Sequence, residues 1–128
     1  MDHDFINHSQ CLLIYHVILV TKYRHKILDM IDVCSIMKEV EKQSDFVILE
    51  QESDLDHIHL MIKHAPKYSP SSLVRRLKML STSIAWKLHK DTLKKYYWKK
   101  KILWSNGFFM TTFGNASIET IRKYIQEQ

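Results

Sequence analysis

Two histidines separated by one residue are the feature of this sequence most suited to chemistry. His57 and His59 lie in the run DHIHLMIKH, residues 56–64. Side chains of an extended strand alternate between its two faces, so both imidazoles would point the same way. Neutral imidazoles are common ligands of divalent metals, and one ion could bind between the pair. The alternative, two surface histidines on an ordinary strand, remains open at this point.

The other residues of this strand predict which way the pair points. Ile58, Leu60 and Ile62 fall on the opposite face and make the better core face. We therefore expect the histidine pair on the face of the sheet that the helices leave free. His64 is expected to be a strand-end residue without a functional role. His16, inside an earlier apolar strand, is expected to be a core histidine with a hydrogen-bond partner.

Two histidines are too few ligands for a stable metal site, so a further ligand must come from elsewhere. Met61 stands where a third strand histidine would be, which argues against a histidine-triad hydrolase. Tyr124 and Gln128 lie four residues apart and therefore on one face of a helix. A glutamine carbonyl can bind a divalent metal, and a tyrosine one turn away could act as a nucleophile. Tyr124 could equally be an ordinary residue of an amphipathic helix.

The elements that would position these residues follow an order typical of one fold class. The patterns predict strands at 11–21, 45–52, 56–64 and 107–113, and helices at 32–43, 69–90 and 117–128. This order predicts an α+β, ferredoxin-like split βαβ fold, with an antiparallel sheet, helices on one face and an extra C-terminal helix. We expect residues 1–128 to form a single domain.

Composition narrows the function classes. With 45% hydrophobic and 26% charged residues, the chain has the balance of a soluble globular domain, and no apolar run is long enough to span a bilayer. Two cysteines without metal-type spacing favour a reducing cytoplasm. Only two glycines are present, which excludes glycine-rich phosphate-binding loops.

The positive charges are clustered. The net charge is +5, and lysines and arginines gather at 22–26, 75–78 and 94–101, where aromatic residues interleave the last cluster. Such clusters suit a polyanionic partner such as nucleic acid, and interleaved aromatics suit stacking on bases. A solvated basic surface remains the alternative for each cluster.

Four ordered segments carry a resemblance to a known family. They are YHVILVTKYRHKIL near the start, DHIHLMI at the histidines, LWSNGFF before the last strand and RKYIQEQ at the end. Together they resemble the single-tyrosine HUH transposases of insertion sequences that move as single-stranded DNA, the TnpA-like and REP-associated tyrosine transposase superfamily. The resemblance runs from about His16 to Gln128.

The resemblance implies a mechanism and its residues. His57 and His59 match the two metal-binding histidines, Gln128 the third protein ligand, and Tyr124 the nucleophile. A divalent metal, Mg or Mn, would polarise the scissile phosphate. Attack by Tyr124 would give a 5′-phosphotyrosine and a free 3′-hydroxyl, and a 3′-hydroxyl from another cleaved end could then reseal the strands.

The resemblance also implies partners. Such proteins act in the prokaryotic cytoplasm on single-stranded DNA with hairpins near the element ends, as homodimers in which one subunit's tyrosine helix completes the other's histidine site. The residues expected to bind DNA are Lys22, Tyr23, Arg24, Lys26, Arg75, Arg76 and Lys78. Two alternatives stay open: an HUH replication initiator or domesticated hairpin-processing relative, and a catalytically silent nucleic-acid-binding domain.

Overall fold

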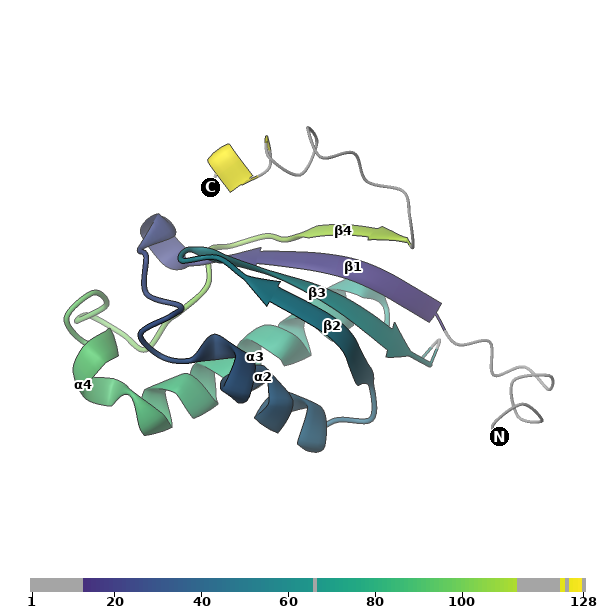
Figure 1. The fold of residues 1–128 in the computed structure, drawn as a ribbon, viewed down its shortest axis with the longest axis horizontal. Helices are drawn as coiled ribbons and strands as arrows, with labels where there is room; N and C mark the ends of the chain where they lie inside the picture. The colour runs from purple at the N-terminus through teal and green to yellow at the C-terminus, as the bar shows by residue number, and fades with distance from the viewer. Residues whose placement is uncertain (1–12, 66, 113–122, 124, 128) are drawn as a thin grey trace.

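The computed structural model describes residues 13–65, 67–112, 123 and 125–127. A four-stranded sheet lies over a layer of helices (Figure 1). The strands are β1 (Leu13–Val20), β2 (Val47–Ser53), β3 (His57–His64) and β4 (Phe109–Thr112). The helices are α2 (Val33–Lys42), α3 (Pro70–Leu88) and α4 (Lys90–Leu93), with a 3-10 turn η1 at Lys22–Arg24.

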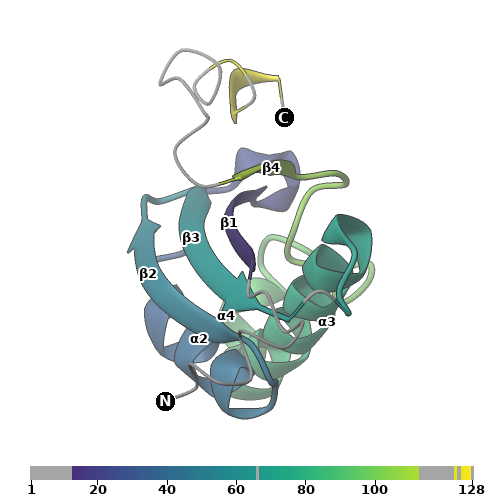
Figure 2. The same cartoon turned by 90° about the vertical axis from the view of Figure 1, so that its right-hand side faces the viewer.

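The sheet is antiparallel throughout, in the order β2-β3-β1-β4. The two long helices both cover one face of it (Figure 2). This arrangement confirms the predicted α+β, ferredoxin-like plan. The predicted C-terminal helix at 117–128 lies largely outside the described residues.

The core forms where β1 and β3 pack on the helices. Val17 and Leu19 pair with Leu60 and Ile58 across the two strands, and all four side chains are fully buried. Burying each of these aliphatic side chains stabilises the fold by about 1.5–3 kcal/mol. The central strands are thereby fixed in register, and a slip by one residue would carry every core side chain to the wrong face.

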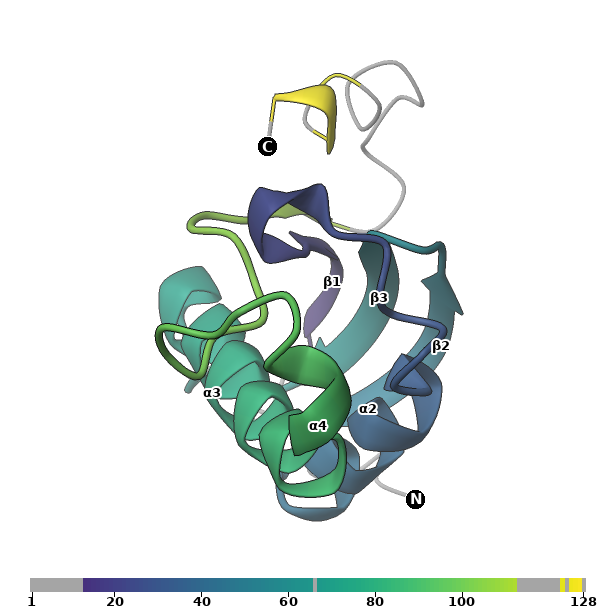
Figure 3. The same cartoon turned by 90° about the vertical axis from the view of Figure 1, so that its left-hand side faces the viewer.

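The long helix α3 begins as its sequence predicts. The Ser69 hydroxyl accepts a hydrogen bond from the Ser72 backbone N–H at 3.1 Å, and Pro70 occupies the first turn. At the far end of α3, Leu88 is 65% exposed, whereas Trp86 is buried. The reason is a packed segment after α4 (Figure 3), to which the Trp86 indole N–H donates a 2.8 Å hydrogen bond at the Ile102 carbonyl.

Candidate functional site

The histidine pair lies on the face of β3 that the helices do not cover. His57 and His59 are half-buried, while Ile58, Leu60 and Ile62 between and beyond them are fully buried against the helices. The predicted orientation of the strand is therefore confirmed. His64, at the end of the strand, faces the core and is 1% exposed.

A hollow of about 280 Å³ opens in front of the two histidines. Its walls are Ile18, Glu52, Ser53, Asp54, His57 and His59. Glu52 stands directly across from His59 in the β2–β3 register. The hollow thus joins two imidazoles with the carboxylates of a neighbouring strand and turn, a mixed set of nitrogen and oxygen donors.

His57 is held by a buried carboxylate. Asp56 Oδ1 lies 3.0 Å from His57 Nδ1, and Asp56 Oδ2 accepts a hydrogen bond from Arg24 Nε at 3.2 Å. Burial acts to raise the pKa of Asp56, but the bonds from His57 and Arg24 outweigh it and hold that pKa below its usual value. A charged Asp56 accepts a proton-bearing Nδ1, which leaves the Nε2 lone pair of His57 for a ligand.

His59 is paired with His16 across the sheet. His16 Nδ1 lies 2.9 Å from His59 Nε2, and the ring centroids are 5.1 Å apart. Burial, and then the charge of His16, lower the pKa of His59. At neutral pH His59 is therefore the neutral imidazole, the form that can bind a metal.

The prediction that His16 is a core histidine is wrong, although it does have a hydrogen-bonding partner. β1 is apolar on both faces, so its sequence does not tell which face meets the helices. In the structure Val17 and Leu19 do, and His16 shares the face of His59. The Ile18 side chain on that same face is also buried, with 2% of its surface exposed.

The two histidines fit a divalent ion in chemistry but need a further ligand. Within the described residues, no group of three or more His, Cys, Asp or Glu side chains is arranged to hold a metal. The third ligand predicted for the site, Gln128, and the predicted nucleophile, Tyr124, both lie outside the described residues. The Asp56 carboxylate on His57 Nδ1 is the kind of contact that orients a metal-binding histidine, whereas His59 is held through its Nε2 by His16.

The predicted basic residues divide into two groups. Arg24 is bonded to Asp56, and Arg76 donates to the Gln43 carbonyl at 2.7 Å and the Ser44 hydroxyl at 3.2 Å at the end of α2. Lys78 donates to the Ser105 and Gly107 carbonyls at 2.8 and 2.6 Å. These three hold the fold together. Of the remaining four, Tyr23, Lys26 and Arg75 are exposed and Lys22 is half-buried.

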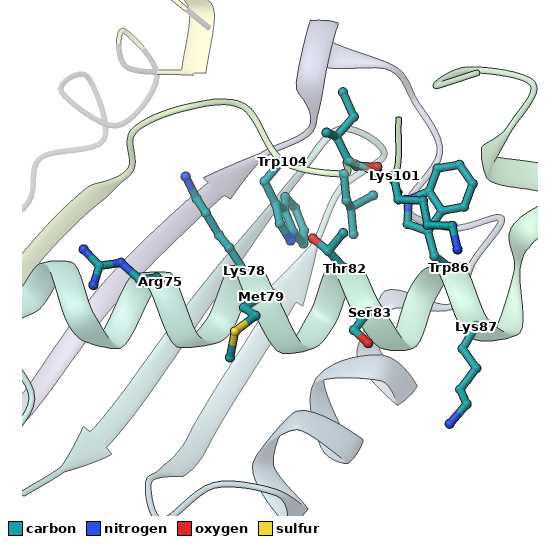
Figure 4. A pocket seen from close by; sticks show the side chains of 11 residues that line it. Arg75, Lys78, Met79, Thr82, Ser83, Trp86, Lys87, Lys101 and Trp104 are labelled. Carbon is teal, nitrogen blue, oxygen red and sulfur yellow. Dashed lines mark hydrogen bonds between the residues drawn. The ribbon is translucent and has the colours of Figure 1, made fainter. Parts of the chain in front are cut away.

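A larger groove runs along α3. It measures about 800 Å³ and lies between the helix and residues 101–104. Figure 4 shows Arg75, Lys78 and Lys87 on the helix and Lys101 on the facing segment. Trp104 closes its floor through a 2.8 Å hydrogen bond to the Ser81 hydroxyl. The groove is therefore lined by positive charge over a fixed aromatic base.

Three partners of the site were not identified from the sequence as site residues. Asp56 could have been, because it directly precedes the histidine motif in DHIH. Glu52 follows only from the β2–β3 register, and His16 only from knowing which face of β1 meets the helices.

Comparison with known families states which class of protein carries this fold and this histidine pair. The family model for IS200-like transposases matches residues 9–128. The chain therefore belongs to the IS200-like transposase family, which confirms the resemblance of its four sequence segments.

Two transposases are similar to this chain over most of their length. The transposase for insertion sequence element IS200 of Salmonella typhimurium is 28% identical over 130 residues, covering 99% of this chain and 84% of the relative. The ISDra2 transposase TnpA of Deinococcus radiodurans is 28% identical over 117 residues, covering 89% and 82%.

Solved structures agree with the fold. A transposase crystal structure from Deinococcus radiodurans R1 superposes with a TM-score of 0.80 at 27% identity, covering 91% of each chain. A REP-associated tyrosine transposase, solved bound to a REP hairpin, has a TM-score of 0.55 at 14% identity and covers 88% of this chain and 62% of that one. In the described part of the chain, no helix has the length and apolarity to cross a membrane.

Proposed function

We propose that this transposase cleaves and rejoins single-stranded DNA at insertion-sequence ends, through a covalent link between Tyr124 and a 5′-phosphate. The observation that supports this most directly is the histidine pair in one hollow, with Asp56 bonded to His57 and His16 bonded to His59. Such fixed imidazoles are what a metal-assisted phosphoryl transfer needs.

In this mechanism the Tyr124 oxygen forms a bond to phosphorus as the bond from phosphorus to the 3′-oxygen breaks. The departing 3′-oxygen takes up a proton and leaves as a hydroxyl. A 3′-hydroxyl from another cleaved end then reverses the step and releases Tyr124, so one phosphodiester is exchanged for another without water. A phenol with an ordinary pKa of about 10 is a poor nucleophile when protonated but a good leaving group.

His57, His59 and Gln128 would hold the divalent metal, Mg or Mn. When bound, that metal would neutralise charge on the scissile phosphate. The chain's own residues prepare the site for it. Asp56 keeps the proton of His57 on Nδ1, and burial keeps His59 neutral. When no metal is bound, the negative charge of carboxylates such as Glu52 at the rim would repel phosphate groups.

The groove along α3 is the surface that we assign to the DNA backbone. Arg75, Lys87 and Lys101 line it, and their charges suit phosphate contacts, which give affinity without reading sequence. The REP-associated neighbour was solved with a hairpin, and we extend a hairpin ligand to this chain. We also propose a homodimer in which Tyr124 of one subunit serves the histidines of the other.

One experiment tests the chemistry. The full-length protein is incubated with a single-stranded hairpin oligonucleotide and manganese, and denaturing gels are examined for a protein–DNA adduct. We expect the adduct with the native chain and with Tyr15→Phe, a helix-side tyrosine, and none with Tyr124→Phe. An adduct that survives Tyr124→Phe overturns the mechanism. Hairpin binding without any adduct would identify a catalytically silent binding domain instead.

The composite site has its own test. His57→Ala and Tyr124→Phe subunits are each expected to be inactive alone. Mixed together, they should regain adduct formation if the tyrosine acts across the dimer, because one of the two sites is then intact. A mixture that stays inactive would place Tyr124 with the histidines of its own chain.

A further inference from the structure

A second hollow, an aromatic cleft, lies on the basic segment that follows α4 and shares Ile102 with the groove along α3. It measures about 260 Å³ and is lined by Tyr23, Tyr96, Tyr97, Trp98, Lys99, Lys100 and Ile102. We propose that this aromatic cleft binds one unpaired nucleobase of a single DNA strand, with the adjoining phosphates on Lys99 and Lys100. The choice of DNA as ligand rests on the proposed function.

The size and chemistry of the cleft suit a single flat heterocycle. Pockets for drug-sized ligands span about 300–1,000 Å³, so a volume of about 260 Å³ holds less than that. Four of its seven lining residues are aromatic and two are lysines. Aromatic faces stack on any base, while lysines track the backbone beside it, which is the usual composition of a single-strand binding site.

Two of the aromatic side chains are exposed to a degree that the fold does not require. Trp98 is 74% exposed and Tyr23 is 69% exposed. The other two tryptophans of the chain, Trp86 and Trp104, are 7% and 6% exposed and donate hydrogen bonds inside the protein. Large aromatics at an exposed site, beside a fixed floor, are typical of surfaces that bind a partner.

The floor of the cleft is rigid. Tyr97 is 4% exposed and its hydroxyl donates to the Lys22 carbonyl at 2.8 Å. The His25 ring lies between neighbours, with its centroid 5.1 Å from Tyr96 and 5.4 Å from Tyr97. Burial raises the pKa of Tyr97, which therefore stays a neutral hydrogen-bond donor. A base entering the cleft would meet an ordered surface and lose little free energy to rearranging it.

Tyr23 is presented by a strained turn. Its φ is 61°, and the next residue, Arg24, has a φ of 54°. The left-handed region is sterically unfavourable for any residue with a Cβ, and here two such residues follow one another. The turn is held by the bond from Arg24 to Asp56 and by the Thr21 hydroxyl donating to the His25 carbonyl at 2.8 Å. Such strain is characteristic of side chains that are held in place for a ligand.

The charges around the cleft favour DNA over a second copy of this chain. Lys22 Nζ lies 5.4 Å from the Tyr23 ring centroid, and Lys99 and Lys100 line the cleft. The same positive surface on a second protomer would repel it, whereas a phosphate backbone would be attracted. The unpaired bases of a hairpin or its flank are then the natural occupants.

The test uses the full-length protein and a short oligothymidine of about 12 nucleotides, with an abasic strand of the same length as the comparison. We expect Trp98→Ala to weaken oligothymidine binding at least about 5-fold, the effect of losing one stacked base. Trp98→Tyr should recover most of the affinity. Leu88→Ala, which removes an equally exposed apolar side chain elsewhere, should leave it unchanged.

Intrinsic fluorescence gives a second readout, because Trp98 is the exposed one of three tryptophans. Oligothymidine should quench the emission of the native protein but not of Trp98→Phe, and the abasic strand should quench neither. Unchanged binding by Trp98→Ala overturns the proposal. So does sedimentation evidence that Trp98→Ala splits a dimer while binding DNA normally, since the cleft is then a protein interface.

A failure of the base-binding proposal can be distinguished from a failure of the proposed strand transfer. The Tyr124 adduct is scored in the native chain and in Leu88→Ala, and oligothymidine binding is scored in Trp98→Ala, so the two proposals are tested on different variants. Normal oligothymidine binding by Trp98→Ala, together with a normal adduct, rejects the base site alone. Weakened binding by Trp98→Ala, with no adduct in the native chain, rejects the transfer chemistry alone.

Discussion

The carboxylate of Asp56 and the imidazole of His57 lie 3.0 Å apart on adjacent residues, and the same carboxylate binds Arg24. A strand normally sends neighbouring side chains to opposite faces. Asp56 escapes this because it precedes β3, in the turn where its carbonyl also accepts a hydrogen bond from the Thr21 N–H at 2.9 Å. The histidine site is thus attached to the η1 turn through one buried aspartate.

Asp56→Asn should weaken metal binding without abolishing it. The amide keeps the shape but loses the charge that orients the proton of His57 and pairs with Arg24. Changes to such supporting residues typically cost about 10- to 100-fold in metal affinity. Calorimetric titration with manganese measures this directly. The matched control is Asp29→Asn, which changes an exposed aspartate. An equal loss of metal affinity in that variant would show that only the net charge of the protein matters.

Two histidines of β3, His57 and His64, should differ when each is replaced. His57→Ala should remove detectable manganese binding, whereas His64→Leu should retain it, because His64 faces the core. In the described structure His64 Nδ1 bonds the Ala65 carbonyl at 2.8 Å and its Nε2 has no partner. Replacing His64 by leucine removes one hydrogen bond and also one buried nitrogen without a partner. These two changes act on stability in opposite directions, so the denaturant midpoint of unfolding should change little. Loss of metal in His64→Leu at an unchanged midpoint would contradict this assignment.

Lys78 and Arg75 should separate stability from DNA binding. Burial, and secondarily the charge of Lys22, lower the pKa of Lys78, whose ammonium holds two carbonyls near the start of β4. Lys78→Met should reduce the free energy of unfolding by about 2 kcal/mol, the range for hydrogen bonds to a charged group. Denaturant unfolding measures it.

Arg75→Met is the comparison on the same helix, one turn earlier and exposed. It should leave the unfolding midpoint unchanged and weaken hairpin binding, with the slope of log affinity against log salt reduced by about 1. If Lys78→Met instead weakened DNA binding at full stability, Lys78 would be a phosphate contact after all.

Asp45 should make stability depend on acidity. Hydrogen bonds from Lys67 and Tyr68 lower the pKa of Asp45 below 3.8. A carboxyl whose pKa is lower in the folded than in the unfolded chain stabilises the fold at pH values above its unfolded pKa. This contribution disappears as the pH falls through its folded pKa. Asp45→Asn should therefore be less stable than the native chain at about pH 6, and the difference should shrink as the pH is lowered below the usual range of an aspartate. A constant difference over this pH range, measured by denaturant midpoints, would show that the charge is irrelevant.

Much of the fold was predictable from the sequence because its signals are local. The alternation in β3 identified both its core face and its histidine face, and Ser69-Pro70 identified the start of α3. β1 offered no alternation, so the position of His16 could not be predicted. The roles of Arg24, Arg76 and Lys78 could not either, because their partners lie roughly thirty residues away in the chain. The predicted roles of Tyr124 and Gln128 stay predictions.

The left-handed turn at Tyr23 and Arg24 has a consequence for how this sequence can vary. One strained backbone sends Tyr23 outward to the aromatic cleft and Arg24 inward to Asp56. Glycine at either position would relax the backbone and release both side chains at once. Substitutions at 23, 24 and 56 should therefore be strongly epistatic, with double variants failing to add, although these residues lie in separate segments of the chain.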